Sequence, residues 1–201
     1  MFLIMKILMF LILLLPSIIY GQSFNSLGQV IVNPDIKSFK ISCIADSFCF
    51  PVNHGSMKGY ENAFTFQQNS NYMQGKHQAV DISKIGGGDN DLGDTIYCIA
   101  NGRVVCSFND VIMVLHKTSE GFIVSLYRHC MELFVRDREY VSMAQPIGRI
   151  GNCNGVYLAH LHFEIRTDIT IGIGTGYGKP DGFVHPLKYI TFKRKEKYIP
   201  F

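Results

Sequence analysis

Beyond its first 21 residues, the chain of 201 residues has no long apolar run, and it has neither an internal repeat nor a heptad pattern. These absences exclude further membrane-spanning helices, repeat architectures and coiled coils, because each depends on such a pattern. Charged residues make up only 17% of the chain, and the net charge is +3. This mild charge predicts no nucleic-acid partner, and nothing in the sequence predicts an oligomeric state.

Two loop motifs are also missing. The glycine-rich segment 172–178 precedes Lys179, but a phosphate-binding loop needs glycine where Ile173 stands and Ser or Thr where Pro180 stands. The run Asp89-Asn90-Asp91 lacks the alternating ligands and the closing Glu of a calcium loop. We therefore interpret the first segment as a flexible loop and the second as a solvated turn.

The first 21 residues predict an export signal. Lys6 supplies a charged start, residues 7–15 are apolar throughout, and residues 16–21 end in small residues before Gln22. Because a spanning helix needs about 20 apolar residues, removal of this segment is predicted, with an uncleaved anchor as the alternative. The protein is therefore predicted to reach a periplasm or the cell exterior, without a stable membrane span after signal removal.

The rest of the chain predicts a single all-β domain. Short β-branched or aromatic segments alternate with turn sequences, which is typical of antiparallel hairpins. These segments are 95–100, 103–108, 111–116 and 122–129. We interpret residues 22–48 as an N-terminal extension, 49–192 as the domain and 193–201 as a basic tail.

The cysteine count is even, which predicts disulfides in an exported protein. The six residues are Cys43, Cys49, Cys98, Cys106, Cys130 and Cys153. Cys43 and Cys49 are close in sequence, and Cys98 and Cys106 flank an Asn-Gly turn, so both pairs are candidates. A catalytic thiol at Cys130 is disfavoured, because neighbours on a strand face opposite sides and His129 would then point away from it.

Histidines in strand-like segments form the most informative pattern. His160 and His162 share a face if their segment is a strand, while Leu161 between them enters a core. His77 and Asp81 form a second pair upstream. A catalytic zinc site takes three His, Asp or Glu ligands and leaves one position for water. His77, Asp81 and one of the paired histidines would supply these three ligands.

Several separate segments resemble, in the same order, the lysostaphin/LytM-like zinc metallopeptidases. The resemblance runs from about residue 50 to residue 190, most of the chain after the signal. The matching segments are Phe50-Pro51-Val52 as a first strand, His77 with Asp81, a hairpin at 95–105, Tyr127-Arg128-His129, Gln145 to Gly148, His160 to Glu164, and Val184 to Leu187.

The resemblance implies roles for five residues. His77, Asp81 and His162 would hold one zinc ion per chain, while His129 and His160 would act on the water and on the tetrahedral intermediate. This division suits the chemistry, because a ligand must be locked on the metal, whereas an acid/base group must stay unbound. Glu164 shares the face of the paired histidines, so it is the alternative third ligand or a partner of a ligand.

The chain also departs from the family pattern. Ala79 replaces the usual Gly between the first two ligands, and Cys130 stands where Leu is expected. Two insertions, at 86–91 and 170–183, lengthen the loops around the predicted cleft. Substrate choice is the property that such loops most readily change.

By resemblance, the predicted function is an exported zinc endopeptidase that hydrolyses amide bonds in peptidoglycan stems or cross-bridges. Whether the bond is a D-amino acid cross-link or a glycine bridge stays open. The alternative is a non-catalytic module of the same fold that binds cell wall or regulates other wall hydrolases, although no ligand is missing here. A cupin-like metal site fits poorly, because the remaining downstream histidine, His185, directly precedes Pro186.

Overall fold

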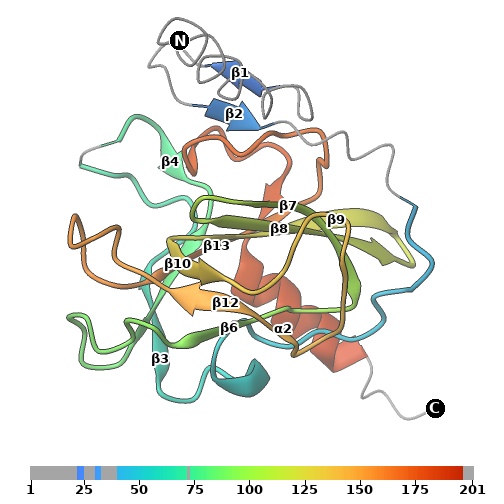
Figure 1. Cartoon of the computed structure of the whole chain (residues 1–201), viewed down its shortest axis with the longest axis horizontal. Coiled ribbons are helices and arrows are strands. Elements are labelled where there is room, and N and C mark those ends of the chain that lie inside the picture. The colour runs from blue at the N-terminus through green and yellow to red at the C-terminus, as the bar shows by residue number, and fades with distance from the viewer. Residues whose placement is uncertain (1–21, 25–29, 33–39, 72, 197–201) are drawn as a thin grey trace, which may run out of the picture.

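The computed structural model describes residues 22–24, 30–32, 40–71 and 73–196, and Figure 1 shows the chain as a ribbon. The predicted export signal lies outside these described residues. Within them, no helix has both the length and the apolar character needed to cross a membrane.

Antiparallel sheets make up most of the regular secondary structure in the described residues, which confirms the predicted all-β class. The largest has the order β11 (Tyr140–Val141), β7 (Gly102–Phe108), β8 (Val111–Thr118), β9 (Gly121–Arg128), β13 (Leu161–Arg166), β5 (Val80–Lys84) and β3 (Tyr60–Phe64), with β15 (Phe183–Val184) paired to β13. A second has the order β10 (Cys130–Leu133), β12 (Pro146–Ile150) and β6 (Thr95–Tyr97). Two small sheets pair β1 (Gln22–Phe24) with β2 (Val30–Val32) and β14 (Tyr177–Gly178) with β4 (Lys76–His77).

Strands β7, β8 and β9 form the consecutive hairpins that the sequence predicts. Phe108 pairs with Val111, and Thr118 pairs with Gly121, so each connecting turn has two residues. Asn109 adopts a φ of 53°, a left-handed conformation that asparagine tolerates better than most residues. The turn chemistry therefore sets the register of the central strands.

The hydrophobic core lies between the two larger sheets. Leu161 and Phe163 of β13 are fully buried, and they share one cluster with Ile96 of β6 and Ile147 of β12. Helix α2 (Pro186–Glu196) adds Ile190 to this cluster, and the helix lies beside the sheets in Figure 1. Burying each such side chain contributes about 1.5–3 kcal/mol, so β13 is anchored firmly through one of its faces.

Two local predictions are wrong. Residues 95–105 do not form a hairpin, because β6 pairs with β12 whereas β7 joins the large sheet. The Asn101-Gly102 step instead connects the two sheets, and a Cβ on Gly102 would lie 2.7 Å from the Leu115 carbonyl. Residues 50–52 are a bend followed by the short 3-10 turn η2 (Asn53–Gly55) rather than a strand.

The predicted disulfides are not formed, since all six cysteines are free. Cys98 lies in the core cluster between the sheets, whereas Cys106 on β7 belongs to a second cluster. The absence of a β6–β7 hairpin explains this separation. Cys49 is buried and its thiol donates to the Cys98 carbonyl at 3.3 Å, while Cys43 is partly exposed.

Candidate metal centre

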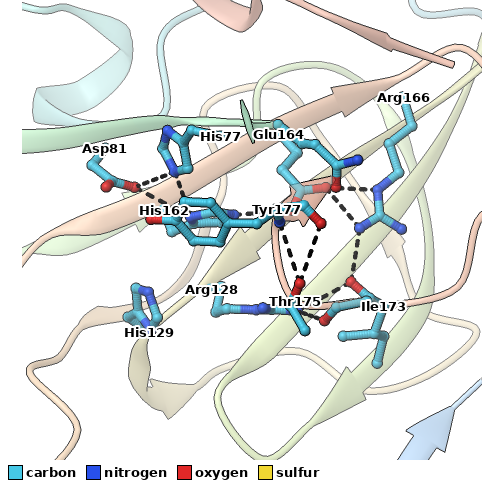
Figure 2. A network of polar contacts seen from close by, with 12 residues as sticks. His77, Asp81, Arg128, His129, His162, Glu164, Arg166, Ile173, Thr175 and Tyr177 are labelled. Atoms are coloured by element: carbon cyan, nitrogen blue, oxygen red, sulfur yellow. Dashed lines mark hydrogen bonds and ion pairs between the residues drawn. The ribbon is translucent and has the colours of Figure 1, made fainter. Parts of the chain in front are cut away.

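Adjacent strands bring the three predicted ligands together. Asp81 of β5 pairs with His162 of β13, so both side chains leave the same face of the large sheet. His77 comes from β4, and its ring centroid lies 4.9 Å from that of His162. Figure 2 shows the three side chains converging on one point.

Their donor atoms form a nearly equilateral triangle. Oδ1 of Asp81 lies 3.2 Å from Nε2 of His77 and 3.2 Å from Nδ1 of His162, and the two nitrogens are 3.1 Å apart. In a tetrahedral zinc site with bonds of about 2.0–2.1 Å, neighbouring donors are about 3.3–3.4 Å apart. The triangle therefore fits zinc after an expansion of about 0.2 Å.

The chemistry of the triangle also suits a cation. Oδ1 of Asp81 is buried and makes no hydrogen bond with the described residues, although it lies near both nitrogens. A buried carboxylate oxygen left in this state is costly unless a cation satisfies it. Two imidazole nitrogens and one carboxylate oxygen are a common ligand set for zinc, so the residues present fit the metal.

Hydrogen bonds orient both histidines toward the triangle. Nε2 of His162 lies 2.9 Å from Oε1 of Glu164, and Nδ1 of His77 lies 3.3 Å from the Thr65 carbonyl. If these nitrogens carry the protons, Nδ1 of His162 and Nε2 of His77 present lone pairs to a metal. Glu164 lies at the far nitrogen of the His162 ring, so it acts on the ligand rather than within the triangle.

Two carboxylates, those of Asp81 and Glu164, lie at or beside the triangle. Burial alone would raise the pKa of Asp81, but contacts with His162 and His77 outweigh it and hold that pKa below its usual range. Burial also opposes ionisation of Glu164, yet the Arg166 guanidinium and His162 lower its pKa to about 2. Both carboxylates are therefore ionised at neutral pH. Two arginines, Arg166 and Arg128, act on Glu164, whereas Asp81 is affected by the two histidines, so Asp81 is the carboxylate available to a bound cation.

His129 and His160 lie next to the triangle without belonging to it. The ring centroid of His129 is 4.7 Å from that of His160 and 5.7 Å from that of His162. The Tyr157 hydroxyl hydrogen-bonds Nδ1 of His129, and Oδ2 of Asp110 lies 3.6 Å from the same nitrogen. Burial lowers the pKa of His129 to about 4, so the ring is neutral at pH 7 and can accept a proton.

Residues 75–172 match the family model of Peptidase family M23, and this span includes all five predicted site residues. The chain contains a lysostaphin/LytM-like peptidase domain of family M23. The predicted family is thereby confirmed. None of the curated proteins compared with the chain matches it.

Solved structures share the fold of the M23 domain. The catalytic domain of lysostaphin from Staphylococcus simulans is 16% identical, with a TM-score of 0.51 over 70% of this chain and 98% of that chain. Whole lysostaphin gives 16% identity and a TM-score of 0.52 over 75% of this chain, which spans only 57% of the longer protein. The SpoIIQ-SpoIIIAH pore forming complex gives 16% identity and a TM-score of 0.54 over 79% of this chain and 100% of that chain.

The insertion at 170–183 packs directly on the predicted ligands of the M23 domain. Tyr177 pairs with His77 across β14 and β4, and their ring centroids are 5.0 Å apart. The Gly176 carbonyl accepts from the Gln78 amide at 2.9 Å. Gly176 itself has a φ of 82°, and a Cβ there would lie 2.5 Å from Cε1 of His162. The insertion is therefore part of the site's wall and requires glycine at this point.

The other insertion, at 86–91, contacts the segment that carries His160, one of the two predicted acid/base residues. Oδ1 of Asp89 accepts from the Ala159 amide at 2.7 Å, which fixes the backbone one residue before His160. Nδ1 of His160 lies 2.7 Å from the Leu158 carbonyl. The segment interpreted from sequence as a solvated turn thus positions a residue of the site.

Three residues of the site were not given roles by sequence reasoning. Tyr157 bonds His129, Arg166 pairs with Glu164, and Arg128 reaches the inserted loop. Arg128 is the middle residue of the Tyr-x-His segment, so this motif already indicates its position beside the site. Tyr157 and His129 are 28 residues apart in sequence, so no short motif indicates their contact. Arg166 lies two residues from Glu164 on β13, so the strand pattern could have indicated that pair.

The remaining candidates stay outside the site. Cys130 is buried, and burial raises the pKa of its thiol far above the usual range, which is unfavourable for a nucleophile. His116 is fully buried on β8, and His54 lies 3.2 Å from the Tyr97 hydroxyl. His185 stacks near Phe66. None of these residues contributes to the triangle.

Proposed function

We propose that the M23 domain is a zinc metalloendopeptidase that hydrolyses amide bonds in peptidoglycan cross-links. The supporting observation is the buried triangle of His77, Asp81 and His162, whose donor spacing suits one zinc ion per chain. When bound, zinc would polarise the scissile carbonyl as a Lewis acid and make water more acidic.

His129 and His160 would carry the proton transfers. A neutral imidazole close to the reacting centre can accept the proton of the attacking water and return it to the leaving amine. Tyr157 and Asp110 both face Nδ1 of His129, so they would hold this ring in one orientation. A protonated imidazole or the second ring would then steady the oxyanion.

Peptidoglycan is the proposed substrate because of the family and the predicted export. Lysostaphin, which shares this fold, is described as an antimicrobial peptidase. The predicted signal at residues 1–21 would deliver the chain to a periplasm or to the cell exterior, where wall polymer is found. We assign the catalytic unit to residues 49–192, with residues 22–48 and 193–201 as flanking segments.

A binding or regulatory module of the same fold is the competing function. The fold also occurs in the SpoIIQ-SpoIIIAH complex, which is described as pore forming. A module without catalysis has no need of three aligned donor atoms and two further histidines beside them. The complete set favours the enzyme.

The deciding experiment incubates purified sacculi with the mature protein, with and without a chelator, and identifies the released fragments. The proposal expects new peptide ends that vanish with chelator and return when zinc is restored. A His160→Ala protein with full zinc content serves as the matched control. Fully zinc-loaded protein that binds sacculi and releases no fragments would support the non-catalytic module instead.

A further inference from the structure

Arg128 occupies the position next to the metal ligands on the active face of the sheet. In strand register, Asp81 pairs with His162, His162 pairs with Arg128, and Arg128 pairs with Val111. Paired residues point to the same face, and neighbouring strands are about 4.8 Å apart. Arg128 is therefore one strand away from His162, on the side opposite Asp81.

Arg128 also lines a cleft of about 600 Å³ that opens beside the acid/base pair. Residues of five segments form its walls, among them Asp110, His129, Tyr157, Ile173 and Thr175. Figure 2 shows Arg128 extending between the sheet and the 173–175 segment, close to His162. A peptide placed with its scissile bond at the triangle would run into this cleft.

Arg128 makes no direct ion pair within 4.0 Å among the described residues, although its charge acts at longer range on Asp110 and Glu164. Its buried Nε has no hydrogen-bond acceptor there. Nη2 donates to the carbonyls of Ile173 at 3.1 Å and Gly174 at 2.8 Å, which satisfies only part of a group with five N–H donors. A buried N–H donor without an acceptor is unfavourable, so the guanidinium retains capacity to bind a further oxygen.

Arg166 provides an internal comparison. It holds the same loop through the carbonyls of Ile171, Gly172 and Ile173, but its charge is paired with Glu164 at 2.6 Å. Holding the loop therefore explains the hydrogen bonds of both arginines, but it does not explain why Arg128, unlike Arg166, makes no direct ion pair where it lines the cleft. Asp110 of the same cleft is engaged with His129.

We propose that Arg128 binds a substrate carboxylate on a residue adjoining the scissile amide. This inference rests on the proposed peptidase function and narrows its substrate. A residue of extended peptide spans about 3.3–3.6 Å, so a group one strand from His162 reaches the residue next to the scissile bond. The preferred substrate is then a cross-link in which that residue keeps a free carboxylate. Glycine bridges, which have no such group, are disfavoured.

The test uses two synthetic cross-linked peptides that differ only in this group, a free carboxylate in one and a carboxamide in the other. We expect the zinc-loaded full chain to cleave the acid with a kcat/KM about 10- to 100-fold higher, as for other charge-assisted hydrogen bonds. Equal kcat/KM values would overturn the inference and leave the peptidase function standing.

Variants separate charge recognition from support of the loop. Arg128→Gln should slow cleavage of the carboxylate peptide and leave cleavage of the carboxamide peptide unchanged. The ratio of their kcat/KM values should therefore fall close to 1. Equal slowing of both peptides would show that Arg128 acts only through the loop, against the inference. Arg149→Gln removes an arginine charge from β12, outside the cleft, and should keep the ratio of the unmodified protein.

Binding gives a readout that needs no turnover. Ketomethylene analogues of the two peptides resist hydrolysis, and calorimetry should show tighter binding of the acid by a similar factor. Equal affinities would overturn the inference even if the unmodified protein cleaves neither peptide. Preferential binding of the acid without cleavage of either peptide would support the subsite and refute the peptidase proposal.

Discussion

His162 and His116 are both buried histidines on the large sheet, with 3% and 0% of their surface exposed, but their neighbours differ in charge. The nitrogens of His116 face neutral oxygens, the Asn101 carbonyl at 3.0 Å and the Ser125 hydroxyl at 2.8 Å. Burial accordingly lowers the pKa of His116 to about 4. Burial would also lower the pKa of His162, but the carboxylates on its two sides reverse the shift and raise it.

This contrast shows that burial alone does not distinguish a ligand from a structural histidine. What matters is the set of partners on the two ring nitrogens. Neutral partners on both sides make His116 a satisfied core residue. A carboxylate on each side of His162 orients the ring and raises its pKa, and this environment suits the predicted role of a metal ligand. Substitution of His162 should therefore affect zinc binding, whereas substitution of His116 should affect the stability of the fold.

The largest effect is expected for His162→Ala, which would break the charged arrangement at its centre. Removing one of three ligands should abolish stable zinc binding and, with it, peptidase activity. Metal analysis of the purified protein measures this directly. Near-stoichiometric zinc in the variant would refute the assignment of His162 as a ligand.

The variants His160→Ala and His129→Ala should retain zinc but cleave the substrate with a lower kcat. Each removes a proton-transfer group beside the triangle, which typically costs about 10²–10⁴ in kcat. The measurement pairs zinc content with cleavage of sacculi for each variant. The roles within the His-x-His pair would have to be exchanged if His160→Ala were zinc-free and His162→Ala kept its metal.

Glu164→Gln should sharpen the comparison by neutralising one of the two carboxylates that flank His162. The variant keeps an oxygen acceptor but loses the charge, and zinc affinity should fall about 10- to 100-fold. Competition with a chelator measures the affinity, and circular dichroism checks the fold. Glu132→Gln removes an exposed carboxylate paired with Arg149 and should leave zinc affinity unchanged. Equal affinities of the two variants would contradict a role for Glu164.

The smallest effect concerns His116 and the pH dependence of stability. The neutral ring is favoured in the folded protein, whereas an unfolded histidine titrates near pH 6.5. The contribution of this residue is thus complete above about pH 6.5 and is lost as the pH falls toward about 4. Its maximum slope is about 1.4 kcal/mol per pH unit.

His116→Gln should flatten the pH dependence in that window. Denaturant unfolding of both proteins at several pH values between 4 and 7 gives the difference in slope. Because the other histidines are shared, the difference isolates His116. Parallel curves across the window would show that the residue does not titrate as its neutral partners require.

Local patterns allowed much of the central sheet and the candidate site to be predicted. Strands β8 and β9 follow alternating segments closed by two-residue turns, so their register is fixed by nearby residues. His160 lies just before β13 rather than on it, yet His129 lies beside the rings of both His160 and His162, so the predicted pair does come together. The residue types already made His77 and Asp81 candidate ligands, and the family resemblance specified His162 as the third.

Long-range packing explains what the sequence did not reveal. The Asn101-Gly102 step is a good hairpin turn locally, yet the strands on either side join different sheets because their apolar faces pack across the core. Arg166 donates to carbonyls of the loop, and any residue type can supply a carbonyl. Such contacts leave no pattern in the side chains of the sequence.

Gly176 has a consequence for protein engineering. Because even a methyl group there would collide with the imidazole of His162, the loop and the ligand strand cannot be exchanged independently. A transplanted loop would need a glycine in register with that ring, together with carbonyls in reach of Arg166. Residues 160–178 are therefore best treated as one cassette when chimaeras of this domain are built.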